Sequence, residues 1–381
     1  MRGDFLRHMP GADASLGKGK SFFYRLHIDP ILLGLLLALV GFGLVILYSA
    51  GGERWAYVER QGIRFLAAFG VMFVVAQFEP SFYKRWSVVL FVLGVIALLG
   101  VMFFGVGAKG AQRWLQLPGL PRFQPSELMK LIVPMMAAWY LSSRYLPPSF
   151  RDVFVTLVLI FVPVLLIVQQ PDLGTSILIA SSGLFVILFA GISWKVVAGF
   201  GAIVASCLPV MWHFVMRDYQ KQRVLTFLDP ESDPLGAGWN IIQSKTAIGS
   251  GGTWGKGWLE GTQSQLNFLP ESHTDFIIAV CAEEFGFVGV LALLGLYLMI
   301  VVRGLYIAVK AQDSYSRLLA GSLILTFFVY VFVNIGMVSG ILPVVGVPLP
   351  LVSYGGTSVI TLMAAFGVIM SIHTHRRFLS R

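Results

Sequence analysis

Ten long apolar runs, separated by short polar breaks, dominate the chain. Each run is close to the ~20 residues that an α-helix needs to cross the hydrocarbon layer of a bilayer. Only Gln169-Gln170-Pro171-Asp172 separates the fifth run from the sixth, which indicates a tight hairpin. The pattern predicts an all-α polytopic membrane protein with about ten transmembrane helices, near residues 29–49, 62–78, 87–105, 128–142, 152–168, 173–191, 194–214, 275–302, 317–340 and 353–373.

Composition excludes a water-soluble globule. Of the 381 residues, 56% are hydrophobic and only 12% are charged, whereas a soluble domain carries about 25% charged residues. The 28 basic residues exceed the 19 acidic ones, and we interpret this excess as membrane topology because Lys and Arg are retained on the cytoplasmic side. No nucleic-acid partner is indicated. The two cysteines, Cys207 and Cys281, predict neither a disulfide framework nor a metal cluster.

Basic residues in the turns place both termini in the cytoplasm. Residues 1–28 form a predicted cytoplasmic tail without a signal-peptide cleavage site, residues 29–376 a membrane domain, and residues 377–381 a second tail. The long polar segment 213–274, between the seventh and eighth helices, then faces the periplasm. This assignment describes a multi-pass protein of the bacterial cytoplasmic (inner) membrane.

Several cations run against this topological bias, because they lie in predicted periplasmic loops. An anionic ligand on that side would explain them. Long loops also translocate regardless of their charge, so both interpretations remain open. The cations include Lys109, Arg113, Arg122, Arg217, Arg223, Lys245 and Lys256.

The segment Gly249–Gly257 is rich in glycine, which suits unusual backbone angles or close approach to a ligand. It lacks the spacing of a phosphate-binding P-loop and no strand precedes it, so it is a weak nucleotide signal. We expect a structured loop beside a membrane site.

Ionisable residues at two helix starts are candidates for chemistry. Asp275 begins the eighth apolar run, where it could cap the helix or act in a site. Glu127 and Lys130 share one face of the fourth helix as an i,i+3 pair, which could be structural or could line a polar cavity. Proline and glycine around Ser353 break the helix, and broken backbone within a membrane must be buried in protein or line a cavity. We therefore expect residues 113–130, 239–275 and 343–358 to converge on one side.

The chain resembles the SEDS family (shape, elongation, division, sporulation) over almost its whole length, and its elongation branch more than its division branch. The resemblance rests on six motifs in the family's order: Lys109 to Trp114, Gln124 to Glu127, Gln170 to Thr175, Ala247 to Gly252, Leu269 to Phe276 and Pro350 to Ser358. It implies a peptidoglycan glycosyltransferase that polymerises lipid II, an undecaprenyl-pyrophosphate disaccharide-pentapeptide, on the outer face of the membrane.

The same resemblance places the family's essential acid on Asp275, its polar pair on Glu127 and Lys130, and its functional tryptophan on Trp114. It also implies a class B penicillin-binding protein and other elongation-complex proteins as partners, beside lipid II and the growing glycan strand. His273 and Ser353 lie in the matching motifs and are expected near the saccharide.

The implied reaction needs few groups, because pyrophosphate is already a good leaving group. One carboxylate can take the proton from the acceptor hydroxyl, and cations can stabilise the departing pyrophosphate. We expect an inverting single displacement with Asp275 as base and pyrophosphate contacts among Arg113, Lys130, Arg217, Arg223 and Lys245. No cofactor is required; a divalent cation is possible. A lipid II flippase and a non-catalytic scaffold are the alternatives.

Overall fold

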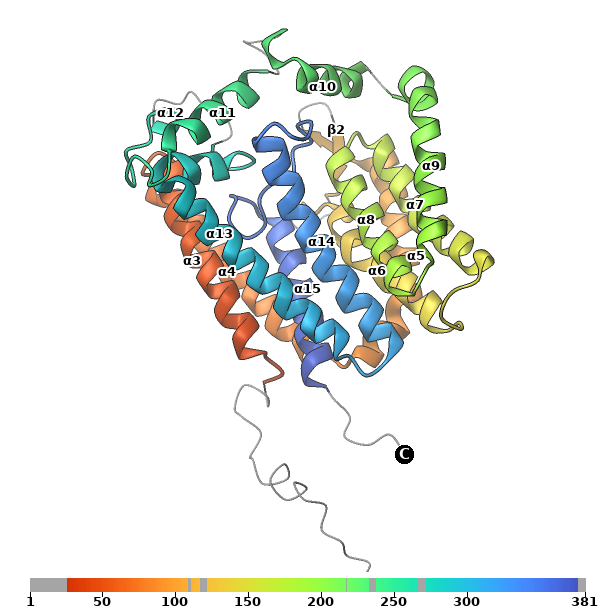
Figure 1. Cartoon of the computed structure of the whole chain (residues 1–381). Coiled ribbons are helices and arrows are strands. Elements are labelled where there is room, and N and C mark those ends of the chain that lie inside the picture. The colour runs from red at the N-terminus through yellow and green to blue at the C-terminus, as the bar shows by residue number, and fades with distance from the viewer. Residues whose placement is uncertain are drawn as a thin grey trace, which may run out of the picture.

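The computed structural model describes residues 26–108, 111–116, 122–216, 218–232, 238–265 and 272–375. Long helices form a bundle, and the shorter elements gather at the end opposite to the start of α3 and the end of α15 (Figure 1). The long helices are α3 (Pro30–Ala50), α4 (Trp55–Ala76), α5 (Pro80–Phe104), α6 (Pro125–Ser142), α7 (Phe150–Gln169), α8 (Leu173–Phe189), α9 (Trp194–Val210), α13 (Ile277–Val309), α14 (Ser314–Val338) and α15 (Thr357–Thr374).

Each of the ten apolar runs overlaps one of these helices, although α4, α5 and α6 begin before their runs. Six described helices, α3, α5, α7, α13, α14 and α15, are long and apolar enough to cross a membrane. Helix α8 is apolar but has only 17 residues, and α4 and α6 carry charged side chains within their sequences. The mostly helical fold is thus confirmed.

A short hairpin adds two strands that the all-α prediction did not include. Strand β1 (Val106–Ala108) pairs antiparallel with β2 (Ala111–Trp114), and Leu115 and Phe123 continue the contact as an isolated bridge. The hairpin follows directly after α5, where the apolar run ends. It brings β2 against the beginning of α6.

The predicted loop 213–274 contains further helices. After a π-helical turn at Met211–Val215 come α10 (Asp218–Leu228), a 3₁₀ turn at Pro230–Ser232, α11 (Trp239–Gly251) and α12 (Thr262–Gln265). Figure 1 shows α10 and α11 lying across the upper end of the bundle. The described part of this segment is thus a layer of short helices over one end of the bundle.

Helix α13 is broken at Gly286, whose backbone angles (φ 65°, ψ −164°) are accessible essentially only to glycine. The glycine-rich segment after α11 provides hydrogen-bond partners for the backbone at this break. Lys256 N and Gly257 N donate to Glu283 O (3.0 Å) and Glu284 O (3.1 Å). In return, Phe287 N and Val288 N donate to Gly252 O (3.0 Å) and Thr253 O (3.2 Å). Four backbone groups released by the break are therefore paired again.

This pairing explains the glycines of the segment. A Cβ on Gly251 would collide with Ala282 O, and one on Gly255 with Glu284 O. Gly255 also has a φ of +82°. The expectation of close approach was right, but in the described structure the group that approaches is the backbone of α13.

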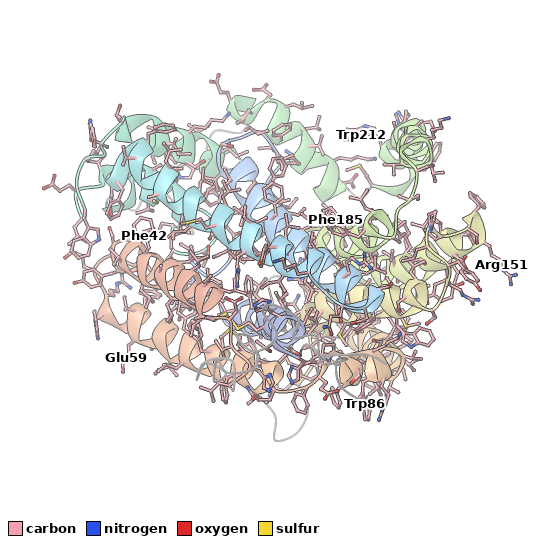
Figure 2. The ribbon with its side chains drawn as sticks, turned by 60° about the horizontal axis from the view of Figure 1, so that its bottom comes forward. Phe42, Glu59, Trp86, Arg151, Phe185 and Trp212 are labelled. Carbon is pink, nitrogen blue, oxygen red and sulfur yellow. The ribbon has the colours of Figure 1, made fainter. Side chains whose placement is uncertain are left out.

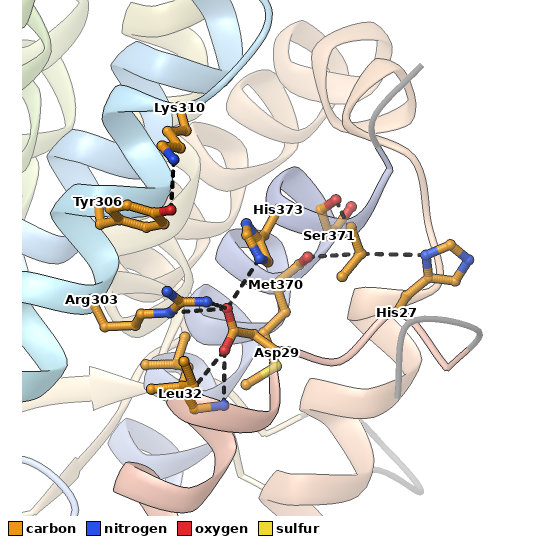
Figure 3. A network of polar contacts seen from close by, with 11 residues as sticks. His27, Asp29, Leu32, Arg303, Tyr306, Lys310, Met370, Ser371 and His373 are labelled. Atoms are coloured by element: carbon orange, nitrogen blue, oxygen red, sulfur yellow. Dashed lines mark hydrogen bonds and ion pairs between the residues drawn. The ribbon is translucent and has the colours of Figure 1, made fainter. Parts of the chain in front are cut away.

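At the opposite end of the bundle, the buried side chain of Asp29 ties three helices together (Figure 3). Asp29 Oδ1 accepts from Ile31 N and Leu32 N, both at 3.0 Å, and so caps α3. Its Oδ2 accepts from Arg303 of α13 (2.5 Å) and lies 3.3 Å from His373 Nε2 of α15. The first turn of α3 is thereby fixed to α13 and α15.

The close packing of Gly255 against the break in α13 leads to a prediction about stability. Gly255→Ala would force a side chain against Glu284 O and strain a positive φ, and we expect it to cost about 2 kcal/mol or more of unfolding free energy. The check is thermal unfolding of the purified protein in detergent. Gly249→Ala is the matched control, because a Cβ there meets nothing within 4 Å. Equal unfolding temperatures for the two variants would contradict the proposed role of Gly255.

Candidate functional site

The short segment that enters α13, residues 272–276, is the centre of the candidate site. Asp275 is half-buried there and precedes Phe276, the N-cap residue of α13. Phe276 provides no side-chain cap bond. Ser272 Oγ donates to Ala50 O at 3.0 Å, which attaches the beginning of the segment to the last residue of α3.

Polar side chains from α14 and from the 347–354 segment hold the backbone around Asp275. Asn334 Nδ2 donates to Asp275 O and to Val347 O, both at 2.8 Å. Ser353 Oγ donates to Thr274 O at 2.5 Å and accepts from Leu349 N at 2.8 Å. Asn334 and Ser353 are 0% and 3% exposed. The position of Asp275 is therefore set by bonds to its own and neighbouring carbonyls.

The Asp275 carboxylate faces the broken segment between α14 and α15. A Cβ placed on Gly346 would lie 3.6 Å from Asp275 Oδ2, and Gly346 has a φ of +72°. Val345 and Val347 on either side pack close to Gly174 in the first turn of α8. Glycine at position 346 thus lets the segment pass between α8 and the carboxylate.

His273 lies between two tyrosine rings. Its ring centroid is 5.2 Å from that of Tyr57 and 5.9 Å from that of Tyr354. Tyr354 N donates to His273 O at 2.9 Å. The imidazole is half-buried, and this packing joins the start of α4 to the Asp275 segment.

Glu127 and Lys130 form the pair that their spacing predicts. Lys130 Nζ lies 2.6 Å from Glu127 Oε1 and also donates to the hydroxyl of Tyr330 on α14. Thr361 Oγ1 on α15 donates to Glu127 Oε2 at 3.3 Å. Both charged residues are buried. A cavity of about 30 Å³ beside them has room for one or two water molecules but not for a saccharide.

Arg113 and Gln124 attach the hairpin region to the α7–α8 turn. The Arg113 guanidinium donates to Gln170 O (3.3 Å) and to Pro171 O. Gln124 Nε2 donates to Asp172 Oδ2 at 3.0 Å, and Asp172 also caps α8 through Thr175 N. Trp114, half-buried, ends β2 opposite Val106. The described residues 113–116 and 122–130 therefore meet the segments 272–275 and 343–358 at one end of the bundle.

The remaining predicted cations lie farther from this centre or beyond the described side chains. Lys245 is exposed on α11, where its stem lies against Gly340 after α14. Arg223 belongs to α10, but its side chain lies outside the description, as does all of Arg217.

Several residues of this region are not among those predicted from the sequence. Arg64 and Gln61 of α4 lie against the 354–356 segment, and Asn334 fastens Asp275. A charged residue near the start of the second apolar run was the available signal for Arg64. No sequence signal pointed to Asn334, since its partners are carbonyls 59 and 13 residues away.

Two other features bear on what the site can bind. Within the described ranges, no group of three or more His, Cys, Asp or Glu side chains could hold a metal ion. An apolar groove of about 770 Å³ lies between α7, α8 and α9 and includes Phe185 (Figure 2). The groove uses the end of α8 that is opposite to Gly174 and the Asp275 segment.

Comparison with known proteins identifies the family. The sequence model of the cell cycle protein family of FtsW, RodA and SpoVE matches residues 30–378. The chain is 55% identical to the peptidoglycan glycosyltransferase MrdB of Escherichia coli K12, over 95% of this chain and 98% of that protein. It is 36% identical to a probable peptidoglycan glycosyltransferase FtsW of Geobacter sulfurreducens, over 91% and 95% of the two chains.

Solved structures agree with this relationship. A chain of a peptidoglycan synthase complex, described as coordinating polymerization and crosslinking, has a TM-score of 0.80 and 30% identity, covering 91% of this chain and 97% of that one. The rod shape determining protein RodA of Thermus thermophilus has a TM-score of 0.68 and 27% identity, covering 91% and 96%. The protein is therefore a helical membrane protein of the SEDS family. Within that family, the E. coli relative MrdB matches it over nearly the whole of both chains.

The buried pair predicts a non-additive response to mutation. Lys130→Met leaves the Glu127 carboxylate buried without its counterion, and we expect a loss of about 3–5 kcal/mol of unfolding free energy. Adding Glu127→Gln removes the uncompensated charge, so the double variant should recover much of that loss. Thermal unfolding of the two single variants and the double variant measures the coupling. Additive losses would show that the two side chains act independently.

Proposed function

We propose that this protein is a peptidoglycan glycosyltransferase that polymerises lipid II into glycan strands during cell elongation. The 55% identity with MrdB, a named peptidoglycan glycosyltransferase, extends over nearly the whole of both chains and supports this activity. The observation that carries the site is the fixed, half-buried Asp275 where the chain enters α13. We assign Asp275 the role of general base.

The surroundings of Asp275 suit proton abstraction in a single displacement. A general base must lie within hydrogen-bond reach of the hydroxyl that it deprotonates, and a fixed backbone limits the positions that its carboxylate can take. Asn334 and Ser353 provide that restraint through Asp275 O and Thr274 O. Inversion at the donor sugar needs no covalent intermediate, so one carboxylate suffices.

The other candidate residues fall into separate groups according to the partners that their side chains contact in the structure. Arg113 and Lys130 are bound to backbone carbonyls and to Glu127, and Ser353 is buried, so we assign them to positioning. Trp114 and His273 remain candidates for contact with the saccharide. Arg217, Arg223 and Lys245 remain candidates for the pyrophosphate, and we assign no step to a metal ion.

The proposed topology has ten transmembrane helices, cytoplasmic tails at 1–28 and 377–381, and a membrane domain over 29–376. The end of the bundle that holds Asp275 and the 213–274 segment faces the periplasm. The partner would be a class B penicillin-binding protein, and the likeness to a chain of a complex that couples polymerization to crosslinking supports this choice.

Asp275→Asn tests the reaction. The variant keeps the size and the backbone bonds of the site but removes the base, so we expect polymerisation of purified lipid II to fall by about 100-fold or more. Glycan chains separated by gel electrophoresis provide the measurement. Glu260→Gln neutralises an exposed acid in the same 213–274 segment and should leave the rate unchanged.

Each alternative has its own outcome. A flippase would move the lipid II headgroup across liposomes without glycan product, and a scaffold would do neither. Full polymerisation by Asp275→Asn, with normal thermal stability, would reject the base assignment. Loss of stability together with loss of rate would instead point to a helix-capping role.

Cysteine labelling tests the topology. In a background with Cys207→Ser and Cys281→Ser, we expect an impermeant maleimide added to whole spheroplasts to label Glu260→Cys and to leave Lys310→Cys unlabelled. Both positions are exposed in the structure. Labelling of Lys310→Cys before the membrane is permeabilised would reverse the proposed orientation.

A further inference from the structure

Arg64 is a charged side chain inside the bundle that no motif of the chain explained. It lies nine residues after Trp55, the first residue of α4, which is about 14 Å along the helix axis. Its guanidinium carbon lies 4.4 Å from the centre of the Tyr354 ring. Among the described residues, no carboxylate forms an ion pair with Arg64. Its one hydrogen bond to a described residue is donated by Nη1 to Gln61 Oε1 at 3.3 Å. Most of its five N–H donors remain available.

Gln61 provides a second donor beside Arg64. Its side chain is 0% exposed, and its Oε1 accepts from both Arg64 Nη1 and Gly355 N, each at 3.3 Å. These two donors fix the oxygen on their side of the amide. The Nε2 group is buried and has no partner within the described structure. An unpaired buried donor is costly, and a ligand acceptor within reach of Nε2 would remove that cost.

The first turn of α15 provides a third set of donors at the same place. Its N-cap is Gly356, which has no side chain to accept a hydrogen bond, and the first turn contains no acidic residue. A Cβ on Gly356 would lie 3.8 Å from Arg64 Nε, so the guanidinium is adjacent to the start of the helix. The backbone N–H groups of a helix N-terminus attract anions.

The charge around these three groups favours an anion. Among the described residues, Glu127 is an acid that contacts α15, through Thr361 one turn after the helix start. Glu127 is already paired with Lys130. A planar guanidinium with an amide N–H and helix N–H groups matches the oxygens of a phosphate better than a single carboxylate. The site also sits next to the Asp275 segment, because Tyr354 N donates to His273 O.

We infer that Arg64, Gln61 and the first turn of α15 form an anion site that binds the diphosphate of a polyprenyl-linked saccharide. The inference rests on the proposed function for the identity of the ligand. Lipid II and the growing strand carry the same diphosphate chemistry, and either one would occupy the site. Binding there would place the sugar end of the ligand beside the segment that carries Asp275.

Direct binding tests this site without requiring catalysis. The purified protein in phosphatidylcholine nanodiscs is titrated with undecaprenyl diphosphate, and with undecaprenol as the uncharged probe. We expect Arg64→Gln to weaken binding of the diphosphate at least tenfold and to leave undecaprenol binding unchanged. Arg64→Lys should recover part of the affinity, because it restores the charge but not the planar fork.

Two further variants separate binding from structure. Gln61→Glu keeps an acceptor for Gly355 N and Arg64 but replaces the unpaired donor with a negative charge, so we expect a larger loss of diphosphate affinity at normal thermal stability. Arg60→Gln is the matched control, since Arg60 is exposed on the same helix four residues away. Unchanged diphosphate affinity in Arg64→Gln and Gln61→Glu would overturn the inference.

A second titration distinguishes the two sources of the diphosphate. If Arg64→Gln weakens binding of lipid II alone, the site holds the donor; if it weakens binding of polymerised strand alone, the site holds the growing chain. Either result supports the site, and equal binding of both ligands to the variant and the parent protein refutes it. A protein that binds diphosphate through Arg64 but forms no glycan would reject the proposed function and retain this inference.

Discussion

Broken backbone inside a membrane bundle must find hydrogen-bond partners within the protein, and the rest of this structure depends on that constraint. The chain breaks helical geometry at Gly286 and again over residues 343–356. At the first break the partner is the backbone of residues 252–257. At the second, Ser353 Oγ donates to Thr274 O and Tyr354 N to His273 O in the 272–276 segment. Helix side chains pair with Val347 O, Pro350 O and Gly355 N. A second non-helical segment thus contributes to the pairing at each break.

This pairing also places the candidate base. The segment before α13 lies between the two breaks. Its carbonyls accept hydrogen bonds from α14 and from residues 353–354. On its other side, residues 252–257 bind the backbone of α13 around Gly286. Glu283 adds a side-chain contact to the same brace, since its Oε1 lies 2.7 Å from Lys256 Nζ. The bonds to Asp275 O and to its neighbouring carbonyls therefore fix the backbone from which the carboxylate projects.

The sequence predicted the helices well because apolar runs of membrane length are a local signal. It also predicted the Glu127–Lys130 pair, whose i,i+3 spacing is local too. It predicted close approach at the glycine-rich segment, but not that the approaching group in the described structure is the backbone of α13 near Gly286. It did not find Arg64 or Asn334 because their partners lie 290 and 59 residues away, for example Tyr354 and Asp275 O. Glycine and asparagine signal unusual backbone, but not which backbone they will contact.

Three buried carboxylates of the described bundle lie beside a cation, whereas buried Glu284 and Asp172 accept hydrogen bonds from hydroxyl, amide or backbone donors. Asp29 lies with Arg303 and His373 at one end, and Glu127 with Lys130 and Glu283 with Lys256 at the other. Pairing of this kind offsets the cost of placing an ion away from water. In the described chain, Arg64 is half-buried beside an aromatic ring and a helix start without such a counterion. The diphosphate ligand proposed above gives a physical reason for this arrangement, because a fixed internal acid would occupy the donors that the ligand needs.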